Sequence, residues 1–254
     1  MTALRARQHE SRDLDMLIFP EGWRDEALPR MSSIIRDSFS EAVPPFLQQW
    51  YGDRYRSFAL SAEWLAHSFV ANAVKEAEGA VKLWRIAGEA RNLPFAAAVV
   101  THASDEARHA RMYMAMLDLA FPGALEGETR ESVAAMFPAY RRNSAPPEDV
   151  PPRPLESLLD DLVQMNIGEI RTRIHQMLLR PVALAVAPPA NRDRLVSILD
   201  RIYADEGSHI IYTAETLERY AGAGSEDRIR SLYRRRLADF SAITIEEVGV
   251  GQFD

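Results

Sequence analysis

The chain has 254 residues, enough for one large domain or two small ones, and 47% of them are hydrophobic, as in folded proteins with a sizeable core. It contains no cysteine, which excludes disulfide scaffolds, cysteine-ligated zinc, iron–sulfur clusters and thiol catalysis. With 30 basic and 37 acidic residues the net charge is -7, so we expect no nucleic-acid partner. We find neither a membrane-spanning stretch nor a signal peptide and expect a cytoplasmic protein.

The first half of the chain is predicted to be helical, because apolar residues recur at spacings of three and four. We expect an irregular arm over 1–30 and a helix over 31–51 that is interrupted at Pro44-Pro45. Two long helices follow, over 58–91 and 94–119. Asn92-Leu93-Pro94 supplies a stop and an N1 proline for the second long helix. So short a connection predicts an antiparallel hairpin.

The second half begins with a long proline-rich crossover and continues with a second hairpin. We expect the crossover over 121–154, with one short helix at 131–139. Two long helices follow, over 155–179 and 192–220, and then a short helix over 227–240 before the tail. We therefore predict an all-α chain built around a four-helix bundle of two hairpins. As a single domain over 1–254, it would comprise an N-terminal arm and helix, the bundle, and a C-terminal helix and tail: 1–57, 58–220 and 221–254.

Two copies of one motif carry the chemistry, each in the second helix of its hairpin. They read Asp105-Glu106-Ala107-Arg108-His109 and Asp205-Glu206-Gly207-Ser208-His209. Glu-x-x-His places a carboxylate and an imidazole one turn apart on one helix face, a mixed oxygen and nitrogen set that suits iron or manganese. The preceding aspartate points about 100° further round the helix, where it could hold the imidazole of the other motif. The alternative is two solvated helix faces with acid–imidazole pairs, which two copies in equivalent places disfavour.

A dinuclear metal site needs one more acid from each remaining helix. On the first long helix Glu76 is the one polar residue of an otherwise apolar stripe, whereas Glu78 shares its stripe with basic residues. A buried carboxylate needs a partner charge or a metal, so Glu76 is the preferred ligand and Glu78 the alternative. On the third helix Glu169 is the only glutamate between Leu158 and Leu179.

With these residues in place, the segment 58–220 resembles the ferritin-like carboxylate-bridged di-iron proteins. That family includes multicomponent monooxygenase hydroxylases, ribonucleotide reductase small subunits, acyl-carrier-protein desaturases and rubrerythrins. The resemblance implies a ferritin-like bundle in which two irons, or a manganese–iron pair, are ligated by Glu76, Glu106, His109, Glu169, Glu206 and His209. It also implies that Asp105 and Asp205 orient the histidines. The chain is shorter than the hydroxylase and reductase subunits, and Ser208 replaces the arginine of the other copy.

Three further residues are candidates for roles near the metals. His102 shares a stripe with Glu106 and His109, and its alternative role is that of a packed histidine in the core or pocket wall. Tyr113 resembles the radical tyrosine that ribonucleotide reductase small subunits carry at this place. Its alternative role is aromatic packing. Arg108 either neutralises acids near the site or docks a redox partner, or it forms a surface salt bridge.

The resemblance implies an O2-dependent di-iron oxygenase that oxidises a small organic substrate, by hydroxylation or N-oxygenation. Electrons would come from an external electron-transfer protein, because no cysteine is present to hold a cluster. Alternatives are a ferritin- or rubrerythrin-like iron-handling protein, a radical-generating subunit, and a helical interaction module without a metal. A homodimer is also expected by analogy with other bundles.

Overall fold

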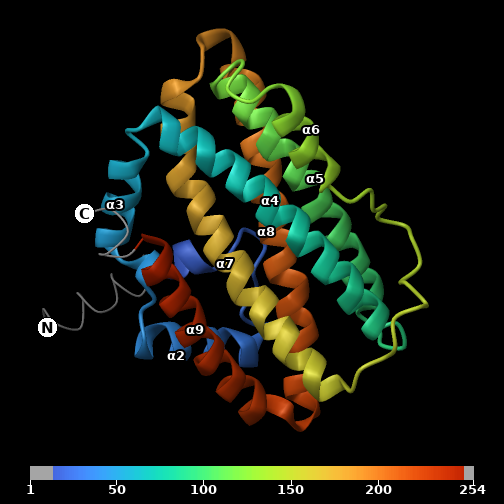
Figure 1. Ribbon diagram of the computed structural model, residues 1–254. Coiled ribbons are helices and arrows are strands. Elements are labelled where there is room, and N and C mark those ends of the chain that lie inside the picture. Colours follow the sequence, from blue (N-terminus) through green and yellow to red (C-terminus); the bar gives the residue numbers. More distant parts are fainter. Residues whose placement is uncertain (1–13, 249–254) are drawn as a thin grey trace, which may run out of the picture. The chain divides into compact units, whose positions relative to one another are not determined.

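The computed structural model describes residues 14–248, and within that range the chain is helical and has no strand (Figure 1). Residues 14–18 are helical. The helices that follow are α2 (Pro29–Glu41), η1 (Pro45–Leu47), α3 (Gln49–Phe58), α4 (Ala62–Glu89), α5 (Ala96–Ala120), α6 (Gly127–Ala135), α7 (Leu155–Val186), η2 (Pro189–Asn191), α8 (Arg192–Tyr220), η3 (Ala221–Ser225) and α9 (Glu226–Val248). None of the described helices could cross a bilayer, since none combines the length with the apolar character needed. The predicted all-α class is confirmed for these residues.

The contacts within the chain divide it into two compact units. The first comprises the described residues within Met1–Tyr55, Leu159–Leu178 and Glu206–Asp254, and the second comprises Arg56–Leu158 and Leu179–Asp205. Helices α7 and α8 each pass from one unit into the other without a break. The second unit therefore holds all of α4, α5 and α6. The first holds all of α2 and α9, and α3 as far as Tyr55.

In the first unit α2 packs against α9 (Figure 1). Helix α2 begins at Pro29 rather than at residue 31, and its N-terminal end is capped from α8 because the Met31 amide donates to Glu218 Oε2 over 2.8 Å. The chain leaves helical geometry before η1, so the predicted break at Pro44-Pro45 is confirmed. The predicted irregular arm is wrong for the helical residues 14–18, and its residues 1–13 lie outside the described range.

Helices α4 and α5 form the hairpin at the centre of the second unit (Figure 1). The Ser61 side chain caps α4 by accepting the amide of Trp64 over 3.2 Å. Their packed faces are rich in alanine, and these alanines are at most 2% exposed: Ala73, Ala77, Ala80, Ala103, Ala107 and Ala110. Small side chains let the two backbones approach closely. Helix α5 begins at Ala96, so Pro94 lies in the connecting turn and is not its first residue.

Two helices are longer than the sequence predicts. Helix α7 continues through Pro181 to Val186 instead of ending near Leu179. The proline costs about 3 kcal/mol in a helix interior, yet the helix continues and Ala183, two residues after the proline, is fully buried. Helix α9 runs to Val248 instead of about residue 240; the rest of the predicted tail, 249–254, lies outside the described residues.

The crossover, residues 136–154, is fastened along α4 and α5 rather than looping into solvent. At one end Tyr140 stacks on Trp84, with ring centroids 4.2 Å apart and planes 3° from parallel. At the other, Arg153 pairs with the buried carboxylate of Glu89, Nε to Oε2 at 3.1 Å. Close packing at Gly88 lies between them.

We predict that Gly88→Ala destabilises the protein by about 1–3 kcal/mol, because it overpacks this contact. A Cβ at Gly88 would lie 2.8 Å from the backbone oxygen of Pro147 and 2.9 Å from Cβ of Val150. Gly79→Ala in the same helix is the control, since its Cβ would come no closer than 3.7 Å to another group and alanine favours helix. Urea unfolding compares the two variants. A Gly88→Ala protein as stable as the Gly79→Ala protein would contradict the packing of the crossover on α4.

Asp160 generates a pH-dependent prediction in the first unit. Arg236 donates two hydrogen bonds to its carboxylate, at 2.8 and 2.7 Å, and Arg235 one at 2.9 Å, and they lower the pKa of Asp160 despite its partial burial. A carboxyl group whose folded-state pKa is lowered stabilises the fold above its unfolded pKa of about 3.9 and loses that contribution as the pH falls through the folded value. Asp160→Asn should therefore cost about 1 kcal/mol at pH 7 and less at about pH 3. Exposed Glu131→Gln should show little loss at either pH; denaturant unfolding at both pH values measures this.

Candidate metal centre

The six side chains predicted as metal ligands fall into two sets of identical composition, one in each unit. We call Glu76, Glu106 and His109 the α4/α5 cluster and Glu169, Glu206 and His209 the α7/α8 cluster. Every member is largely withdrawn from solvent, from fully buried His109 and Glu206 to Glu169, whose side chain is 13% exposed. Each set therefore buries two carboxylates and one imidazole.

In the α4/α5 cluster the carboxylates of two helices meet one imidazole. Glu76, Glu106 and His109 each offer one ligand atom, and these atoms lie within 4.8 Å of one another. His109 Nδ1 is 3.4 Å from Glu106 Oε1 on the same helix face. The alanine-lined packing of α4 on α5 makes the convergence possible, because bulkier side chains would hold the two glutamates apart. Glu78, the alternative on α4, is exposed.

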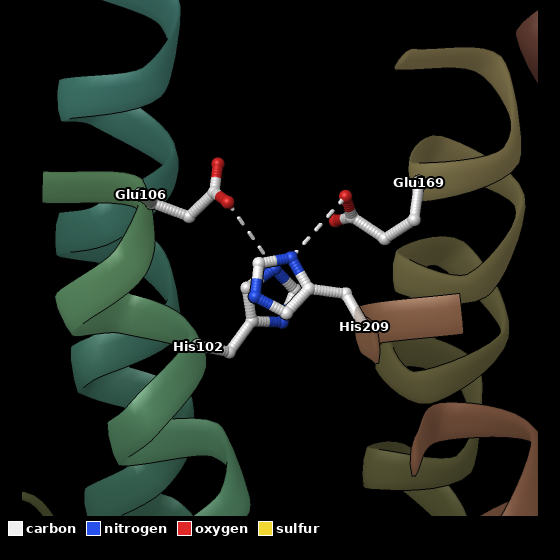
Figure 2. A group of neighbouring side chains, drawn as sticks. All are labelled: His102, Glu106, Glu169 and His209. Atoms are coloured by element: carbon white, nitrogen blue, oxygen red, sulfur yellow. Dashed lines mark ion pairs between the residues drawn. The ribbon is translucent and has the colours of Figure 1, made fainter. Parts of the chain in front are cut away.

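His102 lies one turn before Glu106 on α5 and is fully buried. Its Nε2 is 3.5 Å from Glu106 Oε1, the pair drawn with a dashed line in Figure 2. Tyr113, one turn after His109 on the same helix, is 3% exposed. His102 thus adjoins the α4/α5 cluster through Glu106.

The α7/α8 cluster pairs one imidazole with an acid from each of its helices. His209 Nδ1 lies 3.6 Å from Glu206 Oε2 and 3.8 Å from Glu169 Oε2. Figure 2 shows His209 and Glu169 with their side chains directed toward each other. The arrangement repeats that of His109, whose Nδ1 also faces the glutamate three residues earlier.

Asp205, which opens the second motif, contacts the imidazole of the first. His109 Nε2 donates to Asp205 Oδ2 over 3.2 Å, and this leaves Nδ1 as the atom directed at Glu106. Burial raises the pKa of Asp205, but the hydrogen bond from His109 and the charge of Arg108 outweigh it, and the pKa lies below its ordinary value. An ionised Asp205 accepts the Nε2 proton and so fixes the tautomer of His109.

Three arginines surround the two motif aspartates. Arg108 Nη2 lies 2.8 Å from Asp105 Oδ1 and 2.6 Å from Asp205 Oδ2, and so bridges the two carboxylates. Arg201 Nε donates to Asp205 over 3.0 Å, and Arg142 of the crossover donates to Asp105. Sequence reasoning missed the last two arginines. Arg201 lies four residues before Asp205 and could have been found by helical spacing, whereas Arg142 has no such relation to either aspartate.

The ionisation of Glu106, in the α4/α5 cluster, is strongly shifted. Burial alone raises the pKa of its carboxyl group, but hydrogen bonding with Glu76, His102 and His109 brings it well below the ordinary value. Glu106 is thus held as a carboxylate beside Glu76. A carboxylate kept ionised at 7% exposure is a ready ligand for a cation.

The donor chemistry of both clusters fits iron or manganese. Glutamate oxygens with imidazole nitrogen are the ligands that these metals prefer, and the absence of cysteine removes the softer alternatives. Burying two carboxylates side by side is costly unless a cation or a proton compensates them. A divalent metal would supply that compensation to each cluster.

We predict that Asp205→Asn lowers the stability of the metal-free protein by about 2–3 kcal/mol. The amide removes the charge-assisted acceptor of His109 and leaves the surrounding guanidinium groups with less compensating charge. Asp160→Asn, which also faces two arginines but no histidine, is the matched control. Chemical unfolding measures the stability of both variants. An Asp205→Asn variant no less stable than the control would contradict the stabilising contact between Asp205 and His109.

No family model matches the chain, and neither a curated protein nor a solved structure matches it. The case for a function therefore depends on the side chains of the two clusters and on the contacts that hold them.

Proposed function

We propose that the protein is an O2-dependent di-iron oxygenase that oxidises a small organic substrate by hydroxylation or N-oxygenation. The observation that carries the proposal is the α4/α5 cluster, in which a buried carboxylate pair and an imidazole oriented by Asp205 lie within ligand distance of one another. A manganese–iron pair would use the same ligands.

Two metals require two sets of ligands, and the two clusters provide one set each. Asp205 contacts His109 of the α4/α5 cluster, and Glu206 of the α7/α8 cluster is the next residue of the same helix. We propose that Glu76, Glu106 and His109 would hold one metal and that Glu169, Glu206 and His209 would hold the other.

When bound, the metal pair would supply the reduction and activation of O2. The chain contributes the surroundings of that chemistry. The buried alanines of α4 and α5 exclude water from the carboxylates. Asp205 keeps the proton of His109 on Nε2, and His102 lies where it can hold a proton at Oε1 of Glu106. Tyr113, on the same helix as Glu106 and His109, remains a predicted catalytic residue.

The electrons would come from another protein, because this chain has no cysteine for an iron–sulfur cluster. Arg108 does not need a redox partner to explain it, since it neutralises two buried aspartates. The substrate, the electron donor and a homodimeric state thus remain parts of the proposal that need their own experiments.

We expect the wild-type chain to bind two Fe2+ ions in an anaerobic titration and Glu76→Gln to weaken binding at least about tenfold, since it removes a ligand carboxylate. Glu78→Gln, the same change two residues along on the exposed face, should bind as wild type does. With reductant and ¹⁸O2, the loaded wild type should place one labelled oxygen in a probe such as toluene or aniline, detected by mass spectrometry.

Other outcomes would replace the oxygenase proposal. Mineralised iron in a cage-sized assembly would indicate an iron-storage protein, and a radical signal lost in Tyr113→Phe would indicate a radical-generating subunit. Less than one tightly bound metal per chain would leave a helical interaction module.

A further inference from the structure

We propose that Arg142, in the crossover between α6 and α7, is a positioning residue for the metal centre. It holds Asp105 and thereby frees Arg108 to keep Asp205 on the imidazole of His109. This inference rests on the proposed function, because it concerns the affinity of the centre for metal.

Arg142 grips Asp105 with two parallel hydrogen bonds. Its Nε lies 2.9 Å from Oδ1 and its Nη2 lies 2.6 Å from Oδ2, the bidentate geometry that fixes both position and orientation of a carboxylate. The same Nη2 is 3.9 Å from Asp205 Oδ1. The Asp105 side chain is only 3% exposed, so its charge depends on this arginine and on Arg108.

Arg108 makes the connection from Asp105 to His109. One nitrogen, Nη2, serves both aspartates, at 2.8 Å from Asp105 and 2.6 Å from Asp205. If Arg142 is removed, Arg108 is the arginine that remains within 2.8 Å of Asp105, and it is then less available to Asp205. Asp205 would turn toward Arg201, its partner on α8, and its contact with His109 would loosen. The Nδ1 atom of His109 would then be less well aimed at the α4/α5 cluster.

The crossover delivers Arg142 from a fixed backbone. Two residues earlier, Tyr140 stacks on Trp84 of α4, and its carbonyl oxygen accepts the hydroxyl of Ser104 over 3.2 Å. Arg111 donates to the carbonyl oxygen of Pro138 over 2.8 Å. Because the backbone on this side is attached to both α4 and α5, the guanidinium is held at the aspartates.

The test is an anaerobic Fe2+ titration of the full-length metal-free protein in competition with a chromophoric chelator. We expect Arg142→Ala to weaken the Fe2+ affinity about tenfold, the lower end of the range for residues that orient a ligand. Arg142→Lys should recover part of the loss, since a lysine supplies the charge but not two parallel hydrogen bonds. Arg141→Ala, the neighbouring exposed arginine, should leave the affinity unchanged.

A second measurement separates positioning from simple attachment of the crossover. Arg153→Ala removes another attachment of that segment, at Glu89, and should lower the melting temperature of the metal-free protein without changing its Fe2+ affinity. Long-range ¹H–¹⁵N spectra of His109 should show the Nε2–H tautomer in wild type and a mixture in Arg142→Ala. Equal affinities and tautomers in wild type and in the Arg142→Ala and Arg142→Lys proteins would overturn this inference alone, whereas a wild type that binds no Fe2+ would overturn the proposed function as well.

Discussion

The candidate metal centre depends on how positive charge is distributed around two buried aspartates. Asp105 and Asp205 begin the two motifs, and the guanidinium of Arg108 joins them. Without that cation the carboxylates would repel each other at distances where little water screens them. Because Asp205 also accepts the Nε2 proton of His109, the arginine is connected by a single carboxylate to a candidate ligand. The carboxylate of Asp205 therefore both pairs with Arg108 and orients the imidazole of His109.

The small residues of α4 and α5 are the second requirement. Helical spacing places Glu106 and His109 on one face, but it cannot bring Glu76 to them from another helix. The close approach of the two backbones, lined by Ala73, Ala77 and Ala80, accomplishes this. A chain with the same motifs and leucine at these positions would carry the ligand pattern without the convergence. Composition of the helix interface is thus as important as the motifs themselves.

Much of this could be predicted from the sequence, because it depends on local periodicity. The long helices, the break at Pro44-Pro45 and the burial of Glu76 against the exposure of Glu78 follow from helical spacing. The continuation of α7 through Pro181 could not be predicted, because tertiary burial outweighs the local cost of proline. The contact of Arg142 with Asp105 could not be predicted for a different reason. No periodic relation links a residue of an irregular crossover to a carboxylate on α5. Whether the bundle has the ferritin-like topology, as the resemblance implies, remains a prediction.

The bridging role of Arg108 has a consequence for biosynthesis. Asp205 follows Asp105 by 100 residues, so a ribosome releases α5 and the crossover long before the second aspartate exists. During that interval Arg108 and Arg142 can both neutralise Asp105, but His109 has no acceptor from α8. The nascent hairpin therefore waits in an unfinished state until residue 205 is translated. A metal ion that reached Glu76, Glu106 and His109 before then would meet an imidazole without the acceptor that orients it.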